Sequence, residues 1–270
     1  MAITTMDGLA AAIASGQRIV LQKASITSVA NFYYTLWTAG GNPSAGGAVG
    51  NIAAGVIPTD ATAGSPVIAA FTGSNTGYLM TFDASSSVAG VLSVYDRIYH
   101  AGPFLTTTLH TDTLSGQPAF TRVPGSNYGQ LELWIEVTAV FAAAATTVVV
   151  SYQDGTNTTQ NATHTADVAS LTGAPVNRMY PMRLANNTGI QKINSVTIGG
   201  ATNTTGQFNL VVQRNLADHT VVSANIGRPK KGPFETGMPI IYADSCIAMM
   251  WLATGTSTGT LYAEGLIGNG

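Results

Sequence analysis

Apolar and polar residues alternate along several stretches of the chain, most clearly between Gly129 and Gly155. The first stretch, 131–137, has Leu, Leu, Ile and Val at every second position, with Glu, Trp and Glu between them. A period of two places the apolar side chains on one face of a strand. A second run, 146–152, is rich in β-branched residues and ends at the turn pair Asp154-Gly155. We predict that these runs are neighbouring antiparallel strands at the centre of a β-sandwich.

Short runs of the same kind recur along most of the chain, separated by Gly, Asn and Pro turns. They predict further strands at 18–23, 31–38, 67–71, 77–83, 90–100, 179–184, 190–198, 206–214, 219–224, 239–242, 247–253 and 260–266. No fixed repeat relates them, which argues against a solenoid or a propeller. The predicted fold class is therefore all-β, a jelly-roll-like antiparallel β-sandwich with a short N-terminal helix and an extended arm.

The N-terminal part of the chain differs from the rest. Residues 4–15 predict one Ala-rich helix, which Thr4 or Thr5 can cap and Gly16 can end. A long Gly- and Pro-rich connection follows at 40–58. We predict two parts, a helix and extended arm at 1–58 and the sandwich at 59–270. The helix either covers the sandwich or reaches a neighbouring subunit, and the sequence leaves both open.

Charge is scarce, and this narrows the classes of partner. Charged residues make up 9% of the chain, against roughly 25% in an average soluble domain. The formal net charge is −2, so we expect no nucleic-acid partner. No apolar run of about 18 residues exists, so we expect no membrane partner. Cys246 is the single cysteine, which excludes a disulfide within the chain and predicts a buried thiol.

Few residues are candidates for chemistry. His110 and Asp112 are two apart and can share one strand face, a spacing that is common by chance. Glu132 and Glu136 also share a face, but strand rise separates them by about 13 Å, beyond the carboxylate separation that glycosidases use. No phosphate loop, dinucleotide fingerprint or nucleophile elbow occurs. We therefore expect no catalytic, metal-binding or cofactor-binding residues and no cofactor.

Other candidate residues have a structural interpretation beside a functional one. The three tryptophans favour core or interface packing over a sugar-stacking platform. The compact basic cluster 228–231 is interpreted as a solvated loop. Asp96 and Arg97 lie on opposite faces of one strand, so each is expected to have a partner on another strand or subunit. The tryptophans are Trp37, Trp134 and Trp251.

Several segments together resemble virion structural proteins of tailed bacteriophages, and within that group small β-rich proteins that decorate or cement the capsid. These segments are 34–37 (YTLW), 58–64 (PTDATAG), 94–100 (VYDRIYH), 131–136 (LELWIE), 150–155 (VSYQDG) and 252–256 (LATGT). The resemblance implies a protein without enzymatic activity, made in the cytoplasm of a host bacterium and assembled in many copies on the capsid exterior. Its implied partners are the major capsid protein and itself, as a dimer or trimer. Residues 1–58 would then dock on the capsid or on a sister subunit.

Three other functions remain open at the level of sequence. The protein could belong to the phage tail, as a tube, baseplate or fibre component. It could be a carbohydrate-binding jelly-roll module, which predicts an exposed aromatic cluster. It could be an enzyme built on a sandwich, such as a polysaccharide lyase or hydrolase, which would need a cleft with convergent titratable groups.

Overall fold

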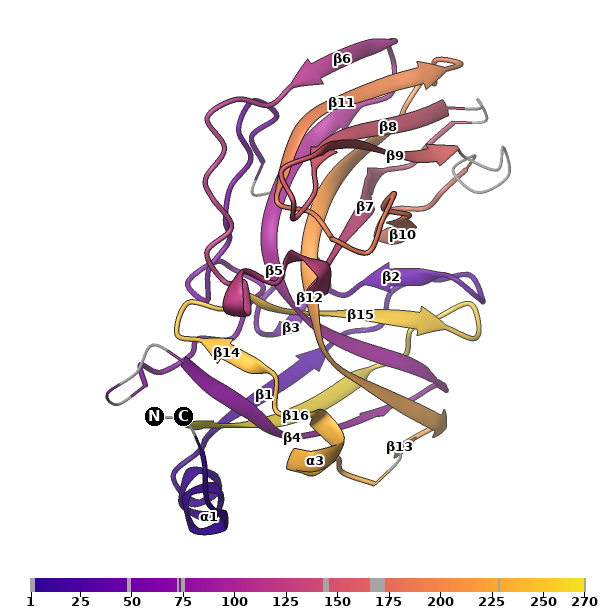
Figure 1. Ribbon diagram of the computed structural model, residues 1–270. Coiled ribbons are helices and arrows are strands. Elements are labelled where there is room, and N and C mark those ends of the chain that lie inside the picture. Colours follow the sequence, from indigo (N-terminus) through magenta and orange to yellow (C-terminus); the bar gives the residue numbers. More distant parts are fainter. Residues whose placement is uncertain are drawn as a thin grey trace. The chain divides into compact units, whose positions relative to one another are not determined.

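The computed structural model describes residues 3–47, 50–71, 73, 76–142, 146–165, 173–227 and 229–269. The chain forms two compact units, each described below by itself (Figure 1). Unit 1 comprises Met1–Gly47, Thr59–Asp96 and Asn215–Gly270, and unit 2 comprises Ala48–Pro58 and Arg97–Arg214. Two long strands, β5 (Gly90–Leu105) and β12 (Gln207–Ser223), contribute one part to each unit. The predicted all-β, sandwich-like fold class is confirmed.

Unit 1 has a five-stranded antiparallel sheet and a second sheet that share one core. The five strands, in spatial order, are β14 (Ile240–Tyr242), β4 (Thr76–Ser86), β16 (Leu261–Asn269), β1 (Gln17–Lys23) and β3 (Gly41–Asn42). The second sheet contains β13 (Ile226–Gly227), parts of β12 and β5, β15 (Ile247–Ala253) and β2 (Tyr33–Thr35). Alternating side chains from both sheets, among them Leu21, Phe82 and Trp251, are buried between them.

The predicted N-terminal helix is confirmed as α1 (Met6–Ala14). Thr5 caps it, because its Oγ1 accepts a hydrogen bond from the Gly8 N–H at 3.0 Å. Leu9 and Ala12 of α1 pack against Met80 of β4. This packing agrees with the interpretation of the helix as a cover on its own sandwich. A short second helix, α3 (Pro233–Thr236), also belongs to unit 1.

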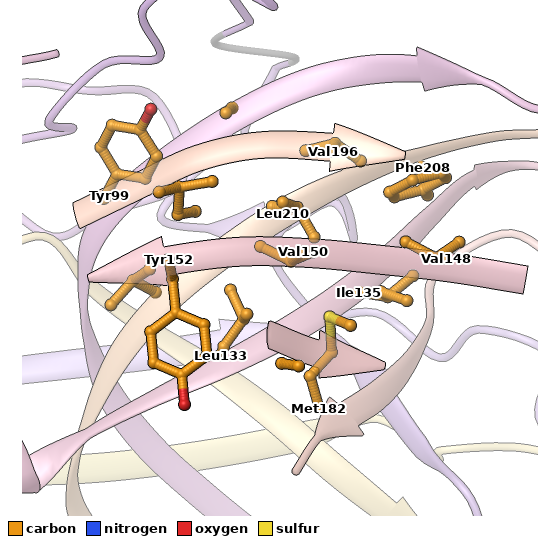
Figure 2. Close-up of a cluster of buried hydrophobic side chains, with 14 of the residues drawn as sticks. Tyr99, Leu133, Ile135, Val148, Val150, Tyr152, Met182, Val196, Phe208 and Leu210 are labelled. Carbon is orange, nitrogen blue, oxygen red and sulfur yellow. The ribbon is translucent and has the colours of Figure 1, made fainter. Parts of the chain in front are cut away.

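Unit 2 contains a four-stranded antiparallel sheet with the order β6 (His110–Thr113), β11 (Lys192–Gly200), β8 (Thr146–Gln153) and β9 (Thr159–Thr165). Its second group of strands is β10 (Arg178–Met182), β7 (Leu131–Ala139) and the first part of β12, with the end of β5. Two single-turn 3-10 helices, η1 (Pro124–Ser126) and η2 (Tyr128–Gln130), precede β7. Figure 2 shows side chains of β8 and β11 meeting those of β7 and β12 in one apolar core.

The predicted pairing of the two central strands is wrong. β7 is hydrogen-bonded to β10 and β12, whereas β8 is hydrogen-bonded to β11 and β9. The two strands therefore belong to different sheets and face each other across the core, with Ile135 and Val150 on the facing sides (Figure 2). A period of two shows which face of a strand is buried, but it does not show which strand lies beside it.

Other boundaries differ from the prediction as well. Residues 67–71 form no strand, and 206–214 and 219–224 are one continuous strand, β12. β6 and β9 were not predicted, because their polar residues lack an apolar alternation. The chain also does not divide at residue 58. Residues 17–23, 33–35 and 41–42 are strands inside the sheets of unit 1, because their alternating apolar side chains fill its core.

Candidate interaction surface

Four connections of unit 2 converge at one end of its strands. In the four-stranded sheet, the antiparallel registers place the end of β11 beside the starts of β6 and β8, and the end of β9 beside the start of β8. In the other group, the end of β7 lies beside the starts of β10 and β12. We call the described residues of these connections, together with Leu105 at the end of β5, the loop end of unit 2. It consists of residues 105–109, 140–142, 173–177 and 201–206.

Backbone hydrogen bonds join the four connections into one surface. The Thr106 N–H donates to the Gly206 carbonyl at 3.1 Å, and the Asn203 N–H donates to the Thr106 carbonyl at 3.0 Å. The Ala142 N–H donates to the Thr205 carbonyl at 3.4 Å, and the Thr205 hydroxyl donates to the Val140 carbonyl at 3.0 Å.

The last of the four connections is held in the same way. The Phe141 N–H donates to the Ala174 carbonyl at 3.3 Å, while the Phe141 ring is buried in the core. Each loop is thus bonded to the next one, so the surface is supported by the sandwich below it. A preordered surface loses less conformational entropy when it binds a partner.

The chemistry of the loop end is uncharged. None of its described residues is Lys, Arg, Asp or Glu, and Thr is its commonest residue. Four of the five large hydrophobic side chains that are exposed in the described part of unit 2 lie on it. These four are Leu105, Leu109, Val140 and Val176. Exposed apolar side chains that gather with hydroxyl groups at one end are typical of an interaction surface.

Several charged and polar residues of unit 2 form one buried cluster. Arg97 and Glu136 form a bidentate ion pair, with Nη1–Oε1 at 3.1 Å and Nη2–Oε2 at 2.6 Å. The Asn209 Nδ2 donates to Glu136 Oε2 at 3.2 Å, and Arg97 Nη2 lies 2.9 Å from His100 Nδ1. All four side chains are buried. Arg122 is also buried and donates from Nη2 to the carbonyls of Pro58 and Arg97.

The contact between Arg97 and His100 defines the protonation state of the imidazole. A guanidinium can only donate, so His100 Nδ1 accepts and the ring is neutral. Burial, followed by the charge of Arg97, lowers the pKa of His100 to about 3. Burial raises the pKa of Glu136, but the charge and hydrogen bonds of Arg97 outweigh this and hold it at about 2. The cluster is therefore a carboxylate, a guanidinium and a neutral imidazole at neutral pH.

The two carboxylates predicted to share a face have separate roles. Glu136 binds Arg97, whereas Glu132 accepts hydrogen bonds from Trp134 Nε1 at 2.9 Å and Gln213 Nε2 at 3.2 Å. His110 and Asp112 do share a face of β6, and His110 Nε2 lies 2.9 Å from Asp112 Oδ2. Among the described residues, no group of three or more His, Cys, Asp and Glu side chains is placed to hold a metal ion.

The structure also locates the remaining candidates. Trp37, Trp134 and Trp251 are buried, as packing residues are expected to be. Cys246 is buried too, and its N–H donates to Asp96 Oδ1 at 3.0 Å. Asp96 also accepts from the Ser245 hydroxyl at 2.8 Å.

The structure describes two of the three basic residues in the cluster at 228–231. Arg228 lies outside the described residues. Lys230 Nζ lies 3.5 Å from Glu264 Oε1, and Lys231 forms an isolated backbone bridge with Phe82. No helix in the described ranges has the length and hydropathy needed to cross a membrane.

Comparisons with known proteins add one weak likeness. No protein family and no curated protein matches the chain. Among solved structures, a mutant VP2 protein of infectious bursal disease virus, in derived T=1 particles, is similar at 9% identity with a TM-score of 0.15. The alignment covers 94% of this chain, which spans 40% of the length of that one. A likeness at this level carries no argument about fold or function.

The residue pattern does not predict the loop end, because each of its segments is typical of an irregular connection or a turn. A signal for it does exist in the sequence. Segments such as 105–109 (LTTTL) and 201–206 (ATNTTG) combine hydroxyl or apolar residues with no charge. Only the registers of the strands show that these segments meet.

Proposed function

We propose that the chain is a structural protein of a bacteriophage virion, and that it decorates or cements the capsid by binding across neighbouring subunits of the major capsid protein. In this role it adheres to the shell without turning over a substrate, and it is present on the capsid exterior in many copies. The resemblance of its sequence segments to phage virion proteins suggests the class. The observation that carries the proposal is the loop end of unit 2.

The loop end supports adhesion through uncharged contacts. Specific interfaces bury about 800 Å² per partner and have an apolar, well-packed centre. Leu105, Leu109, Val140 and Val176 would supply that centre. The exposed threonines of the loop end would supply hydrogen bonds at its rim. Because the surface lacks charge, such binding would depend little on ionic strength.

The alternative carbohydrate-binding function has less support. It requires an exposed cluster of aromatic rings. All three tryptophans are buried, and the exposed large aromatic side chains in the described part of the chain are Phe234 and Tyr262. A protein of the phage tail would adhere through the same kind of uncharged surface. The tail and capsid hypotheses are therefore distinguished by the position of the protein in a particle.

Electron cryomicroscopy of particles that contain the protein tests the proposal. We expect density for the chain on the outer surface of the head, where subunits of the major capsid protein meet, with the loop end of unit 2 facing the shell. Density in the tail, or no density on the particle, would overturn the capsid proposal.

A pair of variants tests the contact surface. Val140→Lys combined with Val176→Lys should reduce the particle-bound copies at least about 10-fold, since a loss of about 1.4 kcal/mol in binding gives that factor. The matched control is Val67→Lys with Val222→Lys, two exposed valines of unit 1. Quantitative gel analysis of purified particles measures both, and equal incorporation of the two variants would contradict the assignment of the loop end.

A further inference from the structure

Strand β9 is an edge of the four-stranded sheet of unit 2. Its seven residues pair with β8 in continuous register from Thr147↔Thr165 to Gln153↔Thr159. In the described part of the chain, no strand pairs with its other side. Alternate residues of an edge strand direct their N–H and C=O groups outward, where they are available to another strand.

Proteins commonly protect such edges, and the other outer strands of the described sheets follow this rule. β3 and β13 are two residues long, and β14 has three. β6, at the opposite edge of the same sheet as β9, has four residues, one of which is Asp112. Short edges and charged edges both oppose pairing with another chain.

β9 has none of these protective features. Its sequence, TQNATHT, contains no Lys, Arg, Asp, Glu, Pro or Gly. Thr159, Asn161 and Thr163 are exposed on one face of the strand, while Ala162 points into the core. The edge is therefore longer than the others compared here, and it is uncharged and accessible.

The turn before β9 holds the strand in a defined position. Asp154 accepts hydrogen bonds from the Thr156 N–H at 2.8 Å, the Thr158 N–H at 3.0 Å and Asn186 Nδ2 at 2.8 Å. The hydrogen bonds from Asn186 and Thr156 hold the pKa of Asp154 well below its usual range. The β8–β9 hairpin is thus braced at neutral pH, so the edge is preorganised for a partner.

We propose that β9 pairs with β9 of a second copy of this chain, antiparallel and about a two-fold axis, which joins two four-stranded sheets into one of eight strands. Pairing of identical strands places the same residues of both copies close together, so a charged edge would repel itself. β9 carries no such charge, and its Thr and Asn side chains can hydrogen-bond across the pair. This inference depends on the fold of unit 2 and not on the proposed function.

Sedimentation equilibrium of the purified chain, from micromolar to submillimolar concentration, tests the pairing. We expect the wild-type chain to form a dimer in this range. Asn161→Lys combined with Thr163→Lys should weaken the dimer at least about 10-fold, because two-fold pairing brings the introduced ammonium groups of the two copies together. The matched control, Thr111→Lys with Thr113→Lys, places two exposed lysines at the same spacing on β6, and it should dimerise as the wild type does.

Three results would overturn the proposal. They are a wild-type chain that stays monomeric over the whole range, a β9 variant that dimerises as strongly as the control, and a dimer that only the β6 variant weakens. Circular dichroism checks that each variant is folded.

If the β9 variant does not fold, hydrogen exchange of the wild-type chain tests the pairing instead. If β9 pairs between two copies, protection of the amides of 159–165 must rise with protein concentration. A wild-type monomer whose β9 amides become protected only on particles would assign the edge to a capsid strand instead.

Discussion

Replacing Glu136 by alanine is expected to destabilise unit 2 by about 3–5 kcal/mol, the usual cost of removing one partner of a buried ion pair. The substitution removes the carboxylate that receives two N–H groups of Arg97 and one of Asn209. The guanidinium of Arg97 stays in an interior that water does not reach, since its side chain is fully buried. A protein stable by about 5–15 kcal/mol loses much of its margin by such a change.

Urea unfolding, monitored by the hydrogen exchange of core amides in unit 2, measures this loss of stability. Glu132→Ala is the control, because Glu132 lies on the same strand but is exposed. Its loss removes only the acceptor of Trp134 Nε1 and Gln213 Nε2, so it should cost about 1–2 kcal/mol, less than the loss of Glu136. The double variant Arg97→Met with Glu136→Leu should recover most of the lost stability, because an apolar pair of similar volume removes the buried charge. Equal effects of Glu136→Ala and Glu132→Ala would contradict the structural role of the ion pair.

Acid is expected to unfold unit 2 well above the pH at which most carboxylates are protonated. The pKa of His100 is about 3 in the folded chain, against an ordinary value near 6.5. Between these values the unfolded chain binds a proton that the folded chain does not, so the free energy of unfolding falls as the pH falls through this window. Glu136, with a folded pKa of about 2, acts in the same direction below its ordinary value near 4.5. Each group changes the free energy of unfolding by up to about 1.4 kcal/mol per pH unit.

The pH dependence of the urea midpoint between pH 7.5 and 4.5 checks this prediction. We expect His100→Gln to flatten the curve, because glutamine keeps an acceptor for Arg97 but cannot titrate. If His100→Gln leaves the slope as steep as in the wild type, the neutral buried imidazole is not the source of the acid sensitivity.

The alternation of apolar residues correctly identified which faces of the strands are buried. Leu133, Ile135 and Val137 of β7 enter the core of unit 2, as their spacing predicts. The same pattern did not show that β7 and β8 lie in different sheets, because any strand with a suitable buried face satisfies it. β12 was predicted as two strands for a similar reason, since the polar residues 213–215 interrupt an apolar pattern without interrupting the sheet.

The polar cluster and the loop end are formed by contacts between residues that are far apart in the sequence. In the sequence, Glu136 is one residue on the polar face of a strand. In the structure, it binds Arg97 of β5, which lies 39 residues earlier in the chain. The loop end gathers segments from 105 to 206, and each of them alone reads as an ordinary turn. Hydrogen-bonding partners at such separations follow from strand order, which a single sequence does not specify.

By itself, the sequence determined the all-β class, the N-terminal helix, most strand positions and an uncharged chain with one buried cysteine. These are local or compositional properties, because they depend on side-chain period, capping residues and residue type. Only the tertiary structure decided the two units, the sheet to which each strand belongs, the burial of Arg97 beside Glu136 and the meeting of four loops at one end. These depend on which strands pair, and pairing is selected by the packing of the whole core.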